Sequence, residues 1–342
     1  MPDELWMSTV RMAGCGLAVA GCAAPAALAG LFFARRRGEP LLPRPRRWPV
    51  PWTGFELVLL FPFAAIAPSA LVDPLLTASG FYSAVYGPDA PAETWSPMRP
   101  LWSAVFFVPL LLGLLLLLRL SLYPDGKNAE HIRAPSIAAR IALGAFAWLA
   151  LHPIVALVHF GVTISFSALD WTVGKHPLEE IAWGSRPALD RVLLLIQASA
   201  LTPLLEELLF RGMLLPWLFG KKYRAGITMA LAMILAAALG IERAAGGDYA
   251  LALGPVGFAI LLLAGWLILR FARRRQSRTE GAIYVSAALF AIVHSNVWPT
   301  PIPLFVLGLG LGWLALRTRG ILAPIIVHGL FNAVSVLFVL GG

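Results

Sequence analysis

The amino-acid sequence predicts an all-α fold, a polytopic transmembrane bundle of about 8–10 helical spans. Of its 342 residues, 59% are hydrophobic and only 13% are charged, and the mean hydropathy is +0.78. An ordinary soluble domain is roughly 45–50% apolar and about 25% charged. The apolar residues come in long runs that short basic clusters separate. Both features are typical of a chain whose helices cross a bilayer repeatedly.

Each expected span is an apolar run near the roughly 20 residues that a helix needs to cross a bilayer. The first run, 9–34, is longer than a signal-peptide core and ends in Arg35-Arg36-Arg37, so we interpret it as a retained span. Cys15 and Cys22 lie inside it, and we expect small packing residues there rather than a disulfide or a metal site. The remaining spans are expected near residues 54–72, 101–122, 138–165, 190–218, 225–240, 252–271, 281–298, 302–316 and 321–341.

The loops between the spans predict the orientation of the chain. Basic clusters occur at 35–47, 221–224, 273–278 and 317–319, whereas segment 73–95 carries acids and no Lys or Arg. Positive charge marks cytoplasmic loops, so the alternation places both termini outside. The net charge of +9 resides in these short clusters, which argues against nucleic acid as a partner and for the lipid bilayer. We expect a multi-pass protein of the bacterial inner membrane, with an endoplasmic-reticulum-like membrane as the alternative.

The chain divides into two expected regions, residues 1–189 and residues 190–342. The first region supplies transmembrane helices and loops of unassigned role. Its Glu179-Glu180 pair lies in a polar loop, where carboxylates are simply solvated. His152 and His159 are seven residues apart and share a helical face. Hydrogen bonds to neighbouring helices explain these histidines, unless they lie near a functional site.

The segment TPLLEELLFRGML, residues 202–214, places three charges inside an apolar span. Ionisable groups at such depth are rare and mark functional sites by default. Glu207 and Arg211 are four residues apart, so they share a helix face and can pair. Glu206 is rotated by about 100° from Glu207 and is left as the free carboxylate. Pro203 is expected to loosen the helix at this point.

Three further polar residues lie in the last spans. His328 and Asn332 are four residues apart and project from one helix face, and Phe290 and His294 share that spacing. The expected depths from the cytoplasmic ends are ~20 Å for His294, ~18 Å for Glu206 and ~10 Å for His328, at 1.5 Å rise per residue. These depths overlap within the tilt of the helices. We therefore predict that the groups converge on one site, although pairing and interhelical hydrogen bonds explain each set taken alone.

The chemistry of this set suits amide hydrolysis. A carboxylate can act as general base on water, an imidazole can bind a metal or polarise a carbonyl, and an amide can donate to an oxyanion. A metal would require two or three ligands from Glu206, His294, His328 and Asn332, yet asparagine is a poor zinc ligand and no H-E-x-x-H helix is present. No G-x-S-x-G elbow occurs either, which argues against a serine nucleophile.

Three motifs in order resemble those of the CPBP intramembrane proteases, the family of CAAX-prenyl endopeptidases and bacterial Abi proteins. EELLFRG (206–212) is similar to the E-E-x-x-x-R motif, FAIVH (290–294) to F-x-x-x-H, and HGLFN (328–332) to H-x-x-x-N. The glycine-rich stretch 308–334 also resembles the family's last two helices. The resemblance covers about 190–340 and implies a CPBP-type catalytic core in residues 190–342.

The resemblance implies a role for each motif residue. Glu206 would activate the attacking water, His294 would hold that water or a metal, and His328 and Asn332 would bind the oxyanion or complete the site. Glu207 and Arg211 would orient Glu206. A zinc ion on Glu206, His294 and His328 and a metal-free glutamate mechanism both stay open.

We therefore expect an intramembrane endopeptidase, glutamate-dependent or metallo-, that hydrolyses membrane-associated or C-terminal CAAX-like peptides. A proton- or ion-coupled transporter is the main alternative, although the sequence shows no inverted repeat. A non-catalytic immunity or scaffold protein of the same fold is the other alternative. The sequence does not indicate an oligomeric state.

Overall fold

The protein is mainly helical in the residues that its computed structural model describes, which are 50, 52–122, 136–169, 188–247, 249–272 and 278–341. No strand occurs within these ranges, which confirms the predicted all-α class. The expected span 9–34, with Cys15 and Cys22, lies outside the described residues, and so does the Glu179-Glu180 pair.

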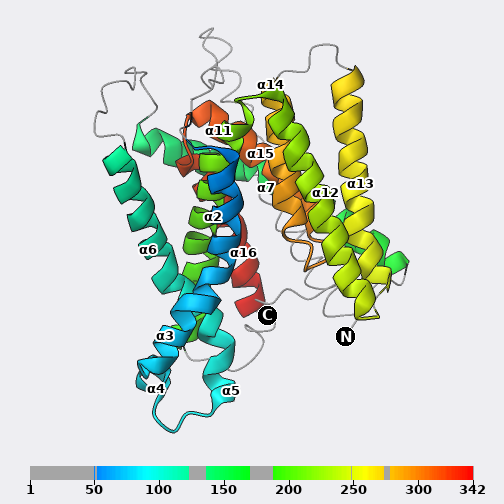
Figure 1. Ribbon diagram of the computed structural model, residues 1–342. Coiled ribbons are helices and arrows are strands. Elements are labelled where there is room, and N and C mark those ends of the chain that lie inside the picture. The colour runs from blue at the N-terminus through cyan, green and yellow to red at the C-terminus, as the bar shows by residue number, and fades with distance from the viewer. Residues whose placement is uncertain are drawn as a thin grey trace.

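The helices run in the order shown in Figure 1. The first group comprises α2 (Gly54–Ala67), η1 (Pro68–Val72), α3 (Asp73–Ala78), α4 (Phe81–Tyr86), α5 (Ala92–Trp95), η2 (Ser96–Met98), α6 (Arg99–Leu122) and α7 (Ile137–Ala168). The second comprises α9 (Ala188–Ile196), η4 (Gln197–Leu201), α10 (Thr202–Glu207), η5 (Leu208–Leu214), α11 (Leu215–Leu218), α12 (Lys222–Ala245), α13 (Tyr249–Ala272), α14 (Arg278–Ile292), α15 (Pro301–Thr318) and α16 (Leu322–Gly341).

Within the described residues, 7 helical stretches are long and apolar enough to cross a membrane. They are Gly54–Ala78, Ala92–Leu115, Ile137–Ala168, Ala188–Leu218, Tyr223–Ala245, Ala252–Phe271 and Pro301–Thr318. Two shorter apolar helices, Thr279–Ile292 and Leu322–Leu337, correspond to the other two spans expected there. The protein is therefore an integral multi-pass membrane protein.

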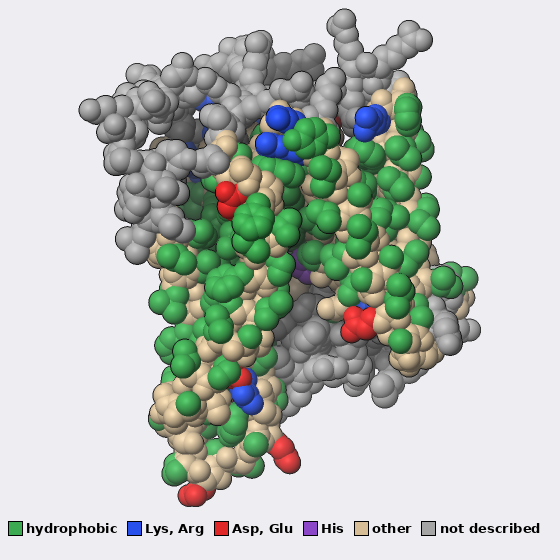
Figure 2. Space-filling model, viewed as in Figure 1, with side chains coloured by type: hydrophobic (Ala, Val, Ile, Leu, Met, Phe, Trp, Pro, Cys, Tyr) green, Lys and Arg blue, Asp and Glu red, His purple; other side chains and the backbone are tan. Residues whose placement is uncertain are grey.

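Charged side chains gather toward the two ends of the molecule. Figure 2 shows most of the visible Lys and Arg side chains at the end where α11 and α14 are labelled in Figure 1, whereas acidic side chains are visible toward both ends, including beyond α4 and α5. Lys221 and Arg224 lie at the start of α12, Arg270 lies in the last turn of α13, and Arg317 lies in the last turn of α15. This distribution agrees with the alternation of basic loops along the sequence.

The acidic segment 73–95 is more than a connecting loop, because it folds into the short helices α3, α4 and α5. Asp73 forms an ion pair with Arg99 at the start of α6, and the Tyr82 hydroxyl donates to Asp73 Oδ1 at 2.8 Å. The Trp95 ring stacks on Tyr82 with a centroid distance of 5.1 Å. Burial of Tyr82, together with its hydrogen bond to Asp73, raises the pKa of its phenol to about 12.

The span 188–218 is not one regular helix. Two π-helical segments, η4 and η5, flank α10, and Pro203 and Pro216 follow them by two residues each. Proline has no N–H and cannot donate to a carbonyl in the preceding turn, so the hydrogen-bond register changes at each of these points. The expected loosening of the helix at Pro203 is confirmed.

The span expected over 281–298 is shorter than predicted. The helix α14 ends at Ile292, and residues 293–300 form successive turns before α15 begins at Pro301. Prolines 299, 301 and 303 disfavour a continuous helix here, because each lacks a donor and restricts the residue before it. The placement of His294 in mid-helix is therefore wrong, since it lies in the turn that follows α14.

Candidate active site

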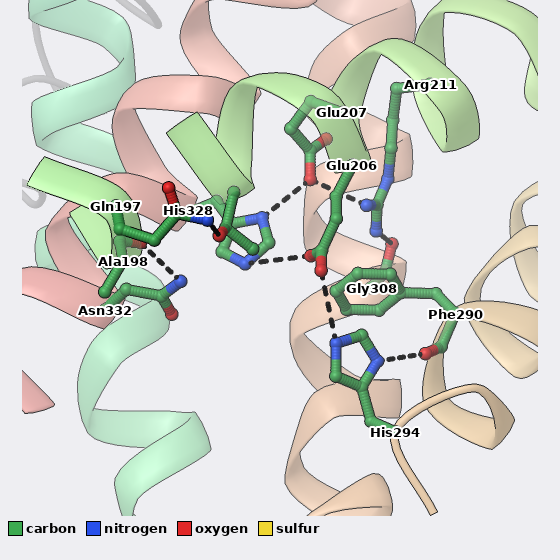
Figure 3. Close-up of polar contacts among 11 residues, drawn as sticks. Gln197, Ala198, Glu206, Glu207, Arg211, Phe290, His294, Gly308, His328 and Asn332 are labelled. Atoms are coloured by element: carbon green, nitrogen blue, oxygen red, sulfur yellow. Dashed lines mark hydrogen bonds and ion pairs between the residues drawn. The ribbon is translucent and has the colours of Figure 1, made fainter. Parts of the chain in front are cut away.

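Five of the predicted side chains form one connected polar network, drawn in Figure 3. Glu206 and Glu207 come from α10 and Arg211 from η5, whereas His294 follows α14 and His328 belongs to α16. These residues are separated by up to 122 positions in sequence, from Glu206 to His328. The predicted convergence of the late polar residues on one place is therefore observed.

Glu207 and Arg211 form a fully buried ion pair. Arg211 Nη1 donates to Glu207 Oε1 at 2.7 Å, and both side chains have 0% exposure. Arg211 Nη2 also donates to the Gly308 carbonyl of α15 at 3.3 Å, and the guanidinium carbon lies 4.5 Å from the centre of the Phe290 ring. The pairing inferred from the four-residue spacing is confirmed, and it ties η5 to α14 and α15.

Glu206 points away from that pair and toward two imidazoles. His294 Nε2 lies 3.4 Å from Glu206 Oε1, and His328 Nε2 lies 3.6 Å from Glu206 Oε2. Glu206 keeps 20% of its side chain exposed and His294 keeps 29%. The rotation between adjacent helical positions thus separates the two glutamates as predicted, Glu207 toward Arg211 and Glu206 toward the space between the two histidines.

His294 is held in one orientation by the helix that precedes it. Its Nδ1 lies 2.7 Å from the Phe290 carbonyl, one turn earlier. A carbonyl oxygen can only accept, so Nδ1 carries the proton and Nε2 is the atom that faces Glu206. The Phe290 ring packs against His294 at 4.9 Å and against His328 at 5.7 Å between centroids. Phe290 therefore supports both imidazoles, a role that the sequence spacing alone did not indicate.

His328 bridges the two glutamates. Its Nδ1 lies 3.0 Å from Glu207 Oε1 while its Nε2 faces Glu206. A carboxylate oxygen only accepts, so Nδ1 carries the N–H that Glu207 receives. At 3.6 Å the Nε2 approach to Glu206 is too long for a direct hydrogen bond.

Asn332 lies one turn after His328 but is bonded elsewhere. Its Nδ2 donates to the Ala198 carbonyl of η4 at 2.9 Å. Among the described residues it makes no contact with either glutamate that would join it to the network. The structure thus brings together five of the six predicted residues directly and places Asn332 beside them.

Sequence reasoning missed the backbone carbonyls of Ala198, Phe290 and Gly308, each of which accepts a hydrogen bond from a site side chain. A signal existed for two of them. Pro203 deprives an earlier carbonyl of its donor, and the glycine-rich start of the 308–334 stretch indicates a close backbone approach.

His152 does not behave as expected for a buried histidine. It is buried between Trp148 and Phe331, with ring centroids 5.0 and 5.1 Å away. Neither of its ring nitrogens has a hydrogen-bond partner among the described residues. The expected interhelical hydrogen bond is therefore wrong for His152, and no contact joins it to the glutamate network.

The polar network lies in the part of the chain that resembles a known protein family. Residues 188–277 and 261–334 match the family model of the Rce1-like type II CAAX prenyl endopeptidases. This stretch is Rce1-like. The match confirms the family that the three motifs indicated, and it includes every residue of the network. No curated protein and no solved structure matches the chain.

The Rce1-like core has a simple charge balance. Glu206 and Glu207 bring two negative charges and Arg211 one positive charge. Because uncompensated charge is costly in a buried site, neutrality requires one proton held among Glu206, His294 and His328. The arrangement can therefore accept and return a proton beside an accessible carboxylate.

The donor types of the Rce1-like core, two imidazoles and a carboxylate, suit zinc. Each imidazole faces a different oxygen of Glu206, and His328 also turns its Nδ1 to Glu207. Within the described part of the chain, no group of three or more His, Cys, Asp or Glu side chains is arranged to hold a metal ion.

Proposed function

We propose that this protein is an intramembrane endopeptidase in which Glu206 activates the water that attacks a peptide carbonyl. The observation that carries the proposal is the division between the two glutamates. Arg211 compensates Glu207 at 2.7 Å, which leaves Glu206 as an accessible carboxylate between two imidazoles at 3.4 and 3.6 Å. The Rce1-like family match supports this proposal at the level of the reaction class.

Each residue has a role in the proposed reaction. Glu206 removes a proton from water as the water oxygen attacks the carbonyl carbon, and the same proton then passes to the leaving amine nitrogen. His294, oriented by the Phe290 carbonyl, positions that water through Nε2. His328 and Asn332 supply N–H donors to the oxyanion that forms on the carbonyl oxygen. Glu207 and Arg211 hold the helix that carries Glu206.

Access to the site supports a substrate that arrives within the membrane. Figure 2 shows a hollow between the part of the molecule that contains α2 and the part that contains α12 and α13, and a histidine side chain is visible inside it. Water must reach this hollow as well, because hydrolysis consumes it. We propose membrane-associated or C-terminal CAAX-like peptides as the substrate class, and the bacterial inner membrane as the location.

The test is cleavage of a peptide library by purified protein reconstituted in lipid vesicles. Wild type is expected to cleave, whereas Glu206→Gln and His294→Ala are expected to lose about 100-fold or more of kcat, the usual contribution of a positioned proton-transfer group. His159→Ala is the matched control, because His159 lies in α7 outside the network. Equal cleavage by all four proteins would show that the assigned site is not catalytic.

The same vesicles separate the two mechanisms. After equilibration with a chelator, a glutamate-dependent enzyme keeps its activity, whereas a metalloenzyme loses it and recovers on addition of zinc. We propose the metal-free mechanism, because a carboxylate between two imidazoles can activate and hold water without a further ligand. Loss of activity to the chelator with recovery by zinc would overturn that choice without affecting the site assignment.

A further inference from the structure

The Ala198 carbonyl marks the place where the broken helix before the glutamates contacts α16. In η4 each N–H donates to the carbonyl five residues earlier, and the last such bond runs from Thr202 N–H to the Gln197 carbonyl. The next donor in this register would be residue 203, which is proline. Because proline has no N–H, the Ala198 carbonyl is left without its helical donor.

Asn332 takes the place of that missing donor. Its Nδ2 donates to the Ala198 carbonyl at 2.9 Å, as Figure 3 shows. A carbonyl oxygen only accepts, so this contact fixes which end of the amide carries the nitrogen. The other N–H of Nδ2 has no partner among the described residues and remains available. Asn332 also lies one turn from His328, which contacts both glutamates.

Gly329 permits the close approach that this bond requires. A Cβ atom at position 329 would collide with the Ser199 carbonyl oxygen, so α16 can lie against η4 only because residue 329 has no side chain. Ser199 is four residues before Pro203, so its carbonyl also lacks the donor of an ordinary α-helical turn. Pro203 removes a single N–H, and the carbonyls of Ala198 and Ser199 both face one short stretch of α16.

We propose that Pro203 is a positioning residue for Asn332. By leaving the Ala198 carbonyl free, it holds the Asn332 amide in the orientation that keeps its second N–H available for the oxyanion. We call this arrangement of Pro203, the Ala198 carbonyl, Asn332 and Gly329 the lock. The donation to the oxyanion rests on the proposed protease function, whereas the lock is a statement about structure alone.

The decisive variant is Pro203→Ala. Alanine supplies an N–H that completes the turn to the Ala198 carbonyl and displaces Asn332, so helix stability is kept or improved while the amide loses its anchor. We expect kcat to fall about tenfold to 100-fold with KM unchanged, because the lost donor acts on the transition state. We expect the unfolding midpoint to stay equal or rise. A residue with a merely structural role would lower stability instead.

Two comparisons isolate the lock. Asn332→Ala should lower kcat by at least as much as Pro203→Ala, and the double variant should be no slower than Asn332→Ala, because both changes remove one interaction. Pro216→Ala is the matched control. Leu215 N–H donates to the Phe210 carbonyl at the end of η5, so Pro216 follows η5 as Pro203 follows η4. Pro216 therefore leaves the Arg211 carbonyl without its helical donor, yet no side chain of the described residues donates to that carbonyl. Multiplicative losses in the double variant would overturn the proposal.

A readout independent of cleavage keeps the lock and the function apart. The asparagines of the chain are Asn128, Asn296 and Asn332, so selective ¹⁵N-asparagine labelling gives few carboxamide signals to assign. In wild type we expect the Asn332 carboxamide proton that is bonded to the Ala198 carbonyl to exchange slowly with solvent, and in Pro203→Ala we expect its signal to shift and exchange faster. Fast exchange of this proton in wild type would overturn the lock even if Pro203→Ala fails to fold. If instead the lock is seen but wild type cleaves nothing, the proposed function fails and the lock stands.

Discussion

Removal of the Arg211 side chain tests the buried ion pair on which the site is built. Both partners have 0% exposure, so Arg211→Ala leaves the Glu207 carboxylate buried and without its cation. Breaking one partner of such a pair costs about 3–5 kcal/mol. The variant also loses the bond to the Gly308 carbonyl and the contact with the Phe290 ring. We therefore expect the free energy of unfolding to fall by about 3–5 kcal/mol or more.

The assay is reversible unfolding in mixed detergent micelles, followed by tryptophan fluorescence. Arg224→Ala is the control, because Arg224 Nη1 donates to the Trp217 carbonyl at 2.7 Å and its guanidinium lies 4.8 Å from the Trp217 ring centre. Arg224 therefore matches the carbonyl and ring contacts of Arg211 but has no carboxylate partner in the described residues. We expect Arg224→Ala to lower the free energy of unfolding by about 1 kcal/mol.

A double variant distinguishes charge from packing. Arg211→Met with Glu207→Gln removes both charges together, and replacement of a whole buried pair is often close to neutral. The double variant should therefore be more stable than Arg211→Ala. The reasoning fails if Arg211→Ala unfolds within about 1 kcal/mol of wild type, or if removing both charges restores nothing.

Two further predictions concern groups outside the network. His152→Phe should keep or raise stability, by about 1 kcal/mol, because it removes two ring nitrogens that are buried without a partner between Trp148 and Phe331; a clear loss of unfolding free energy would reveal a polar contact. The pKa of Tyr82 stands above its ordinary value of about 10. Its protonated form therefore stabilises the fold fully below that value, and this stabilisation is lost as pH rises through about 12. The tyrosinate absorbance of wild type minus that of Tyr82→Phe should rise with a midpoint near pH 12. A midpoint near the ordinary tyrosine pKa of about 10 would contradict the role of burial.

The division between the two glutamates was predictable because helical spacing is a local property. Adjacent helical positions point about 100° apart, whereas positions four apart share a face. Glu207 therefore meets Arg211, and Glu206 faces elsewhere, even though π-helical turns interrupt the span. The irregular turns were indicated only by Pro203, and their hydrogen-bond register could not be derived from it.

Contacts between distant segments were beyond local reasoning. The local structure predicted at His294 was wrong, because the helix α14 ends at Ile292 rather than near residue 298. His328 bridges Glu206 and Glu207, and Asn332 turns to the Ala198 carbonyl, although a shared helix face suggested one common target for both. The partners of His328 and Asn332 depend on how closely α16 approaches η4. Gly329 permits a close approach but does not specify it.

The sequence by itself determined the membrane class, the helical fold and the identity of the charged residues, because hydropathy and helical periodicity are written along the chain. Only the tertiary structure decided which nitrogen faces which oxygen and which backbone carbonyls complete the site. The physical reason is range: helix formation depends on neighbours within a few residues, whereas a hydrogen bond requires atoms from separate helices to meet within about 3 Å.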